Sequence, residues 1–355
     1  MNDRPVPRSL IEGPSAWIGA DLRQRPGDWI YTLSAGEVAE IEAAVASVQA
    51  RGLDIADLTR AEFPLPQFGA TLDGLRHEVL NGRGFILVRG WPVLDKPIEQ
   101  NAIAYCGIGS YFGAMRSQNA AGHLLGHVRD VGAPPADKVP TVRAYQTAER
   151  QMFHTDGADI VGLLCLRTSK SGGLSSLVSS MSIYNRMATE RPDLLSRLMA
   201  PIPFDRRGEI PAGMLGWFAV PLILDHDGLV TIHYSRRNIN SSQRHLDAPR
   251  LTDEDYAALD LFDTLANDAD LRLDMALEPG DMQFLHNHTI LHDRTSFEDW
   301  PEEHRKRHLL RLWLAPPDAR PLDPRMAERF GSVTIGDRGG IFVPGSRLHA
   351  PLTAV

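Results

Sequence analysis

A His-x-Asp pair, formed by His154 and Asp156, most constrains how this 355-residue chain can fold. Residues i and i+2 of an extended strand point to the same side, so the two side chains can bind adjacent corners of one metal. With a further histidine, such as His292 far downstream, they make the ligand set of a mononuclear non-haem Fe(II) oxygenase. The alternative is a hydrogen-bonded surface pair, because such a pair is common by chance among 13 histidines.

The segments beside both motifs have the pattern of buried strands. Residues 160–166 are a nearly continuous apolar run, which places His154 at the mouth of a strand. Residues 278–285 combine a Pro-Gly-Asp turn with a short apolar stretch. His286, His288 and His292 follow it, and the local pattern leaves all three open as the third ligand.

Residues 307–314 predict a strand whose two faces differ. With a period of two, Arg307 and Arg311 share one face with Leu309 and Trp313, while the other face is mostly leucine. A buried guanidinium needs a carboxylate partner, and a dicarboxylate cosubstrate would satisfy one of these arginines. The alternative is an edge strand with two solvated arginines.

The order of these motifs resembles that of the TauD/TfdA family of Fe(II)/2-oxoglutarate dioxygenases, part of the clavaminate synthase-like superfamily. The matching elements are His-x-Asp, Gly-Gly-x-Ser at residues 172–175, Pro-Gly-Asp, Asn-x-x-x-x-His at 287–292 and the arginine strand. Residues 81–90 also resemble the first core strand of that family. The resemblance implies that His154, Asp156 and His292 hold the iron, since Asn287 precedes His292 by the spacing of the motif.

The resemblance further implies that Arg307 and Ser175 bind 2-oxoglutarate. In some relatives the position of Arg311 meets an anionic group of the substrate, and in others it is structural. The implied reaction hydroxylates an unactivated C–H of a small, carboxylate-bearing molecule, consumes dioxygen and releases succinate and CO2. The alternative is a cupin-type hydrolase or isomerase that keeps the metal and does not use 2-oxoglutarate.

The implied fold is mainly β with flanking helices, built on a double-stranded β-helix of the jelly-roll, cupin-like type. We expect N-terminal helical decoration over residues 1–60 and the barrel domain over 61–315, with a lid inserted at about 184–271. Helices are predicted near residues 34–52, 192–198 and 252–266, and a β-hairpin over 222–234. Residues 316–355 are expected to be an irregular tail on the surface, or one that reaches a neighbouring subunit in a homo-oligomer.

Substrate selection is expected in the lid and in the segment before the His-x-Asp pair, where aromatic and polar residues mix. The candidate substrate contacts are Arg311, Asn119, Tyr145, Trp217 and Tyr234, with Gln118, Arg143, Arg236 and Arg237 as further candidates. Arg206 and Arg207 are expected to be solvated. For each candidate, the alternative is a packing aromatic or a solvated arginine.

Composition excludes several classes of partner. A net charge of -8 without a basic stripe argues against a nucleic-acid substrate. No run approaches the ~18 apolar residues of a membrane-spanning helix, and the N-terminus lacks the apolar segment of a signal peptide. Two cysteines, Cys106 and Cys165, are too few for a disulfide framework and are expected to be reduced. A cytoplasmic location is therefore predicted.

Overall fold

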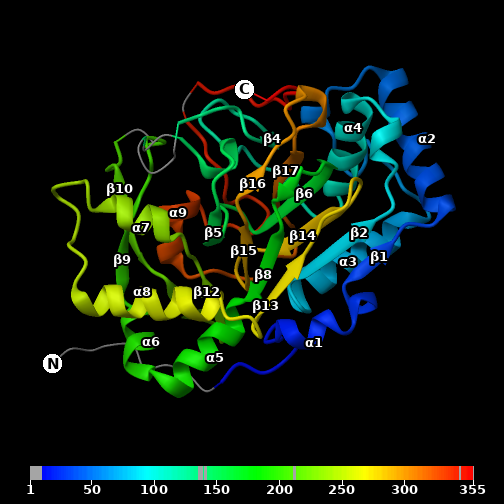
Figure 1. Cartoon of the computed structure of the whole chain (residues 1–355). Coiled ribbons are helices and arrows are strands. Elements are labelled where there is room, and N and C mark those ends of the chain that lie inside the picture. Colours follow the sequence, from blue (N-terminus) through cyan, green and yellow to red (C-terminus); the bar gives the residue numbers. More distant parts are fainter. Residues whose placement is uncertain (1–9, 135–138, 140–141, 211–212, 344, 355) are drawn as a thin grey trace.

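Two β-sheets form the centre of the computed structural model, which describes residues 10–134, 139, 142–210, 213–343 and 345–354 (Figure 1). The large sheet has the order β1 (Ile30–Thr32), β2 (Phe85–Arg89), β14 (Met282–His286), β6 (Ile160–Arg167), β17 (His308–Ala315) and β3 (Ala114–Met115), and β4 (Leu125–Val128) also pairs with β17. The small sheet has the order β13 (Arg272–Met275), β8 (Ser175–Ser179), β15 (Ile290–Arg294) and β5 (Gln151–His154). A short ribbon joins β7 (Ser171–Gly172) to β16 (Phe297–Glu298).

The chain passes repeatedly between the two sheets, as in a jelly roll. β5 lies in the small sheet and the next strand, β6, in the large one, while β14 lies in the large sheet and the next strand, β15, in the small one. Phe85, Leu285 and Trp313 of the large sheet pack in one core cluster with Leu177 and Leu273 of the small sheet. Because the two sheets share this core, segments distant in sequence meet at their edges.

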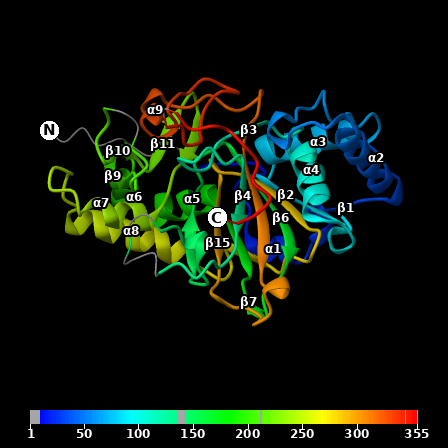
Figure 2. The same cartoon turned by 90° about the horizontal axis from the view of Figure 1, so that it is seen from above.

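The expected fold class is correct in part. The described strands form two packed sheets without a ladder that closes them into a barrel, and helices hold more of the described residues than strands do. "Mainly β" is therefore wrong, because helices cover the sheets on both sides (Figures 1 and 2). The N-terminal region is not wholly helical either, since β1 pairs in parallel with β2.

Helices α2 (Ala35–Arg51), α3 (Phe68–Asn81) and α4 (Ile98–Gly109) cover the outer face of the large sheet. A capping box starts α2, so the predicted helix near residues 34–52 is confirmed: the Ser34 hydroxyl accepts from the Glu37 backbone N–H, and the Glu37 carboxylate accepts from the Ser34 backbone N–H. Gly52 ends it in the left-handed region at φ 64°. Leu310, Leu312 and other leucines of β17 pack under these helices, so the predicted apolar face of that strand is confirmed.

A second group of elements packs beside the small sheet and includes the predicted insertion. It contains α5 (Ser180–Glu190), α6 (Pro192–Leu198), the ribbon of β9 (Pro201–Asp205) and β10 (Trp217–Pro221), the hairpin of β11 (Ile223–His226) and β12 (Leu229–Ile232), α7 (Arg236–Ser242) and α8 (Asp253–Ala266). Val178 and Leu291 of the small sheet share its core. The predicted helices at 192–198 and 252–266 and the predicted hairpin are confirmed. Near the N-terminus, the short α1 (Gly19–Arg23) contacts β13.

The C-terminal segment packs into the molecule, and is not merely laid on its surface. It contains α9 (Ala327–Phe330), whose Phe330 shares a small core with Leu224 and Met326. Arg338 is buried and donates to both carboxylate oxygens of Asp159, just before β6. In the part of the chain that the structure describes, no helix combines the length and apolarity needed to cross a membrane.

The Arg338–Asp159 pair should hold this segment in place. Replacing Arg338 by Met leaves the buried Asp159 carboxylate without its main partner, so we expect the free energy of unfolding to fall by about 3–5 kcal/mol. Arg325→Met is the matched control, since the Arg325–Asp323 pair lies on the same segment with an exposed guanidinium. Its loss should cost under about 1 kcal/mol. Equal losses in denaturant unfolding would contradict this account.

Candidate functional site

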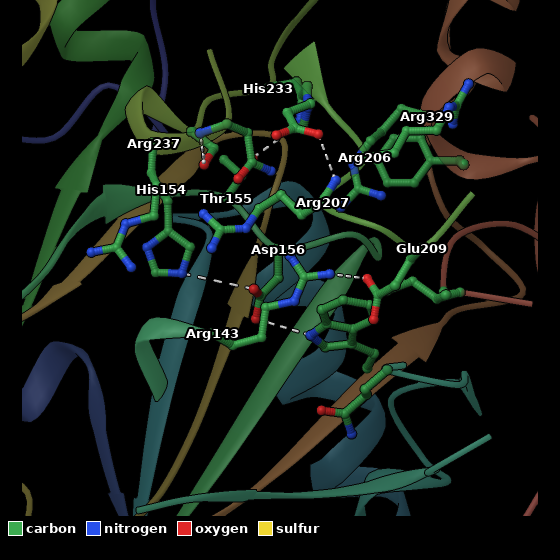
Figure 3. A pocket seen from close by; sticks show the side chains of 18 of the residues that line it. Arg143, His154, Thr155, Asp156, Arg206, Arg207, Glu209, His233, Arg237 and Arg329 are labelled. Carbon is green, nitrogen blue, oxygen red and sulfur yellow. Dashed lines mark hydrogen bonds and ion pairs between the residues drawn. The ribbon is translucent and has the colours of Figure 1, made fainter. Parts of the chain in front are cut away.

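The structure brings His154, Asp156 and His292 together. His154 ends β5 and pairs across the sheet with His292 on β15. Each of the three side chains offers one atom within 4.8 Å of those of the other two. Nε2 of His154 lies 3.7 Å from Oδ1 of Asp156, and Nε2 of His292 lies 3.9 Å from Oδ2. Figure 3 shows His154 turned toward Asp156 at one side of a pocket.

Local hydrogen bonds orient this group. The Asp156 backbone N–H donates to Oδ1 of Asn287, at 2.9 Å. Nδ1 of His154 lies 2.9 Å from the Met152 carbonyl, so Nδ1 carries the proton and Nε2, which contacts the Gln151 amide at 2.8 Å, keeps the lone pair that a metal requires. The competing histidines point elsewhere: Nε2 of His288 contacts Asp159, and Nδ1 of His286 contacts Thr289. Of the three distal histidines, the structure therefore places only His292 in the group.

Electrostatics keep the three side chains in the forms that bind metals. Burial raises the pKa of Asp156, but the charge of Arg311, the two imidazoles and the Trp313 N–H outweigh it and lower that pKa to about 2. Burial lowers the pKa of His154, and burial together with His154 lowers the pKa of His292 to about 3. At neutral pH the group is thus one carboxylate and two neutral imidazoles, which fits a divalent transition metal.

Arg311 is held against this group by neighbours from three segments. Its Nε donates to Oε1 of Gln118 at 2.7 Å, and its Nη1 lies 3.5 Å from Oδ2 of Asp156. The guanidinium lies over the rings of Tyr145 and Trp313. Trp313 donates its Nε1–H to the same Asp156 oxygen, at 2.9 Å. Arg311 therefore orients the carboxylate of Asp156 and favours its ionised form.

A narrow second cavity adjoins the group, and both residues predicted to bind a keto acid line it. Arg307 and Ser175 are buried there beside His292. Within the described residues, Nη1 of Arg307 is buried without a hydrogen-bond partner. The cavity also contains Arg294, a residue that the sequence analysis missed. Its Nη2 donates to the Thr147 carbonyl, while its Nε and Nη1 are buried without partners in that part of the chain.

Arg294 could have been found from the sequence. It lies two residues after His292 on β15, so the period of two places both on the same side. Two buried guanidinium groups with donors to spare create a strong demand for an anion. Burial lowers the pKa of Arg294 to about 9 and that of Arg307 to about 10, so both stay charged at neutral pH.

The larger cavity, of about 530 Å³, opens on the other side of His154 and Asp156. Its wall includes six of the predicted substrate contacts: Gln118, Arg143, Tyr145, Arg236, Arg237 and Arg311. Tyr145 and Arg311 line the second cavity too, so the two cavities meet beside His154, Asp156 and His292. A volume of this size suits a small-molecule ligand.

Three predicted contacts lie elsewhere. Tyr234 is fully buried, packs on Phe262 and donates its hydroxyl to Asp263. Asn119 closes its own turn by accepting from the Ala121 backbone N–H. Trp217 begins β10 outside the cavity wall. Tyr234 serves packing and Asn119 a turn, and the described cavity wall includes none of the three, so the structure does not support their expected contact with a substrate.

The expectation that Arg206 and Arg207 are solvated is also wrong. Both line the large cavity, and Arg207 is 4% exposed. Arg206 stacks over Phe218 and donates to the Glu328 carbonyl of the C-terminal segment. That segment closes the cavity with Arg329 and Phe330, among others, which the sequence analysis had assigned to the surface. These contacts join segments more than 100 residues apart, beyond the reach of any local pattern.

Family comparison agrees with the motifs. The model of the Taurine catabolism dioxygenase TauD, TfdA family matches residues 53–313. The chain belongs to this family. It is therefore a non-haem iron dioxygenase that uses 2-oxoglutarate, and the resemblance found in the sequence is confirmed.

Individual relatives of this TauD/TfdA-family dioxygenase cover most of its length. It is 31% identical over 306 residues to FR-33289 synthase of Streptomyces rubellomurinus (strain ATCC 31215), a match that covers 86% of this chain and 90% of that protein. It is also 31% identical over 317 residues to the Taurine hydroxylase-like protein SAT17 of Stachybotrys chartarum (strain CBS 109288 / IBT 7711), covering 85% and 81%. Its fold is similar to that of the non-heme iron oxygenase OrfP in complex with Fe and alpha-ketoglutaric acid, with a TM-score of 0.60, 16% identity, and coverage of 80% of this chain and 93% of that chain.

The wall of the large cavity should be sensitive to acid through Asp205. Burial raises the pKa of this carboxyl, but hydrogen bonds from Arg244, Ser241, the Arg207 backbone and His245 lower it from 3.8 to about 2. A lowered carboxyl pKa adds stability above about pH 4 that is lost as the pH falls toward 2. We expect Asp205→Asn to cost about 2 kcal/mol at pH 7 and to flatten this acid limb in urea unfolding.

Asp193→Asn is the control for that experiment. Asp193 also has its pKa lowered to about 2, chiefly by the Arg191 side chain, but the pair lies on the exposed surface. Solvent screening makes such pairs weak, so this variant should follow the wild-type stability profile. An Asp205→Asn profile that coincides with the control would show that the buried carboxylate does not stabilise the wall.

Proposed function

We propose that the protein hydroxylates a C–H bond of a small anionic molecule, with Fe(II) held by His154, Asp156 and His292. The observation that carries this proposal is the position of the three side chains between two cavities. One is narrow and contains two buried arginines, and the other is large enough for a substrate. A cosubstrate and a substrate can thus approach one metal from different sides.

Each residue around the metal has a separate task. When bound, Fe(II) with 2-oxoglutarate and dioxygen supplies an oxidative decarboxylation that yields succinate and CO2 and inserts oxygen into a C–H bond. Arg307 and Arg294 would hold one carboxylate of 2-oxoglutarate, with Ser175 lining the same cavity. Trp313 and Arg311 fix the Asp156 carboxylate, so that its orientation does not change when ligands enter.

Residues from about 184 to 271 act as the lid in this proposal and select the substrate. The residues that they contribute to the wall of the large cavity include Asp205, Arg206, Arg207, Glu209, Arg236, Arg237 and Asn238. The same elements share a core with β8 and β15, which carry Ser175 and His292. Substrate recognition is thereby coupled rigidly to the metal ligands.

A metalloenzyme of cupin type, a hydrolase or isomerase that does not use 2-oxoglutarate, is the second candidate. It would use the same three ligands and the same large cavity. Such an enzyme would need no anion in the narrow cavity. The buried nitrogens of Arg294 and Arg307 that have no hydrogen-bond partner among the described residues would then stay unpaired. The cost of burying unpaired charges therefore favours the keto-acid reading.

Anaerobic absorption titration tests the proposal without a substrate. We expect metal-free protein to develop a visible charge-transfer band when Fe(II) and then 2-oxoglutarate are added. Asp156→Ala should lose the band because a metal ligand is gone. Arg307→Gln should still bind Fe(II) but need about tenfold or more 2-oxoglutarate, the usual loss for one charged hydrogen-bond partner. Folded wild type with bound Fe(II) and no band would favour the cupin-type alternative.

The role of Arg294 yields a separate prediction. Arg294→Gln should also weaken 2-oxoglutarate binding by about tenfold, because two of its nitrogens lie unpartnered beside the cavity. Arg305→Gln is the matched control, since its guanidinium is exposed over Trp300. Calorimetric titration of the Fe(II) protein measures both. An Arg294→Gln protein that binds 2-oxoglutarate like the wild type would limit Arg294 to anchoring the Thr147 carbonyl.

A further inference from the structure

The wall of the large cavity carries an excess of positive charge. Its described lining contains seven arginines and four carboxylates: Arg143, Arg206, Arg207, Arg236, Arg237, Arg311 and Arg329 against Asp156, Asp205, Glu209 and Glu328. The chain as a whole has a net charge of -8, so this excess is local. A concave site with one sign of charge attracts ligands of the opposite sign.

Ion pairs account for part of this wall. Arg143 pairs with Glu209, Arg206 with Glu328, and Arg311 with Asp156. Arg236 is neutralised from behind by Asp260 and Asp263, which lie outside the lining. Arg237 is compensated only weakly, since Nη2 of its guanidinium lies 4.0 Å from Oε2 of Glu149.

Three of these arginines converge from separate segments. Arg207 donates its Nη2–H to the Val142 carbonyl, next to Arg143, at 2.6 Å. Burial and the like charges of Arg143 and Arg237 lower the pKa of Arg207 to about 10, so it remains charged at neutral pH. Nη1 of Arg237 is buried and has no hydrogen-bond partner among the described residues. We call Arg143, Arg207 and Arg237 the arginine cluster, and one carboxylate of the lining, that of Glu209, pairs with Arg143.

Arg207 has an unfavourable backbone conformation. Its φ is 55°, in the left-handed region that residues other than glycine rarely adopt. The Asp205 carboxylate fixes it by accepting from the Arg207 backbone N–H at 2.8 Å. Arg244 and Ser241 in turn hold Asp205. A strained residue that its surroundings over-determine is typical of a ligand-binding position.

The arginine cluster and the metal ligands face the same space. His154 and Asp156 line the cavity together with all three arginines. Figure 3 shows Arg143, Arg207 and Arg237 around the space beside His154 and Asp156. An anionic group bound by the cluster would therefore leave the remainder of a small molecule within the cavity that the metal ligands line.

We propose that Arg143, Arg207 and Arg237 bind a dianionic tetrahedral oxyanion of the substrate, a phosphonate or a phosphate ester. A carboxylate has two oxygens in one plane and one charge, so it matches one guanidinium fork. A phosphoryl dianion offers three oxygens and about two charges, which suits guanidinium groups that approach from three directions. This inference rests on the proposed function for its geometry, because the bound group positions a C–H bond for the metal and does not itself react.

Calorimetric binding of small probes to the metal-free protein tests the cluster independently of the reaction. Ethylphosphonate and ethyl phosphate supply the dianion, whereas ethanesulfonate and propanoate supply a tetrahedral and a planar monoanion. We expect both dianions to bind about tenfold or more tightly than either monoanion at about pH 9, where both phosphoryl probes are mostly dianionic. The tighter of the two dianions identifies the source of the phosphoryl group.

Variants locate the binding to the cluster. Arg237→Gln and Arg207→Gln should each weaken dianion binding about tenfold or more, and Arg207→Lys should restore part of it. Arg186→Gln, a change of the same charge in an exposed pair on α5, should bind the probes like the wild type. If Arg207→Gln fails to fold, Arg237→Gln still decides the outcome, because its side chain is partly exposed.

The outcomes separate this inference from the proposed function. Monoanions that bind as tightly as dianions, dianion binding unchanged in the folded cluster variants, or no binding of any probe up to high millimolar concentration would each overturn the inference. If the Fe(II)–2-oxoglutarate band forms in that same protein, the proposed function stands without it. Dianion binding without such a band would support the cluster and remove the proposed function.

Discussion

The ionised carboxylate of Asp156, buried between two sheets, is the constraint on which the site depends. A charge in this position is costly unless it is compensated, and two other segments hold this residue. Trp313 and Arg311 approach from β17, while Asn287 fixes the backbone from the turn between β14 and β15. Satisfying one carboxylate therefore sets the position of the large sheet relative to His292 on the small one.

The same buried group divides the interior into two chemical environments. On the side of β15 and β17, the buried Arg294 and Arg307 line a narrow cavity between the sheets. On the other side, the lid and the C-terminal segment build a wide cavity whose wall is rich in arginine. The first is built by strands with a fixed register, and the second by loops and short helices. This division suits an enzyme with a constant cosubstrate and a variable substrate.

The C-terminal segment shows how local and long-range interactions combine. The sequence of this segment did not indicate that it contacts the site. In the structure, Arg338 donates to Asp159, three residues after Asp156. Arg206 of the lid donates to Glu328 of the same segment. The cavity wall is thus tied to the strand that follows the ligands, so packing at the tail supports the geometry of the site.

Sequence periodicity by itself determined which side chains of one strand lie on the same face. It predicted His154 and Asp156 on one side, the shared face of Arg307 and Arg311, and the apolar face of β17, because strand geometry alternates side chains without regard to the remainder of the fold. Motif spacing added the family and His292. These predictions did not require knowledge of the residues that pack against the strand.

Only the tertiary structure decided which side chains face the large cavity. Tyr234 was expected to face a substrate, but its ring packs on Phe262 of α8 and its hydroxyl donates to Asp263 of the same helix. Arg207 lies in a segment whose composition is typical of a solvated loop. In the structure, Asp205 holds its backbone and its guanidinium donates to the Val142 carbonyl. Orientation in loops follows from partners that are distant in sequence, and no local period encodes them. The positive cavity of an acidic protein arises in this way.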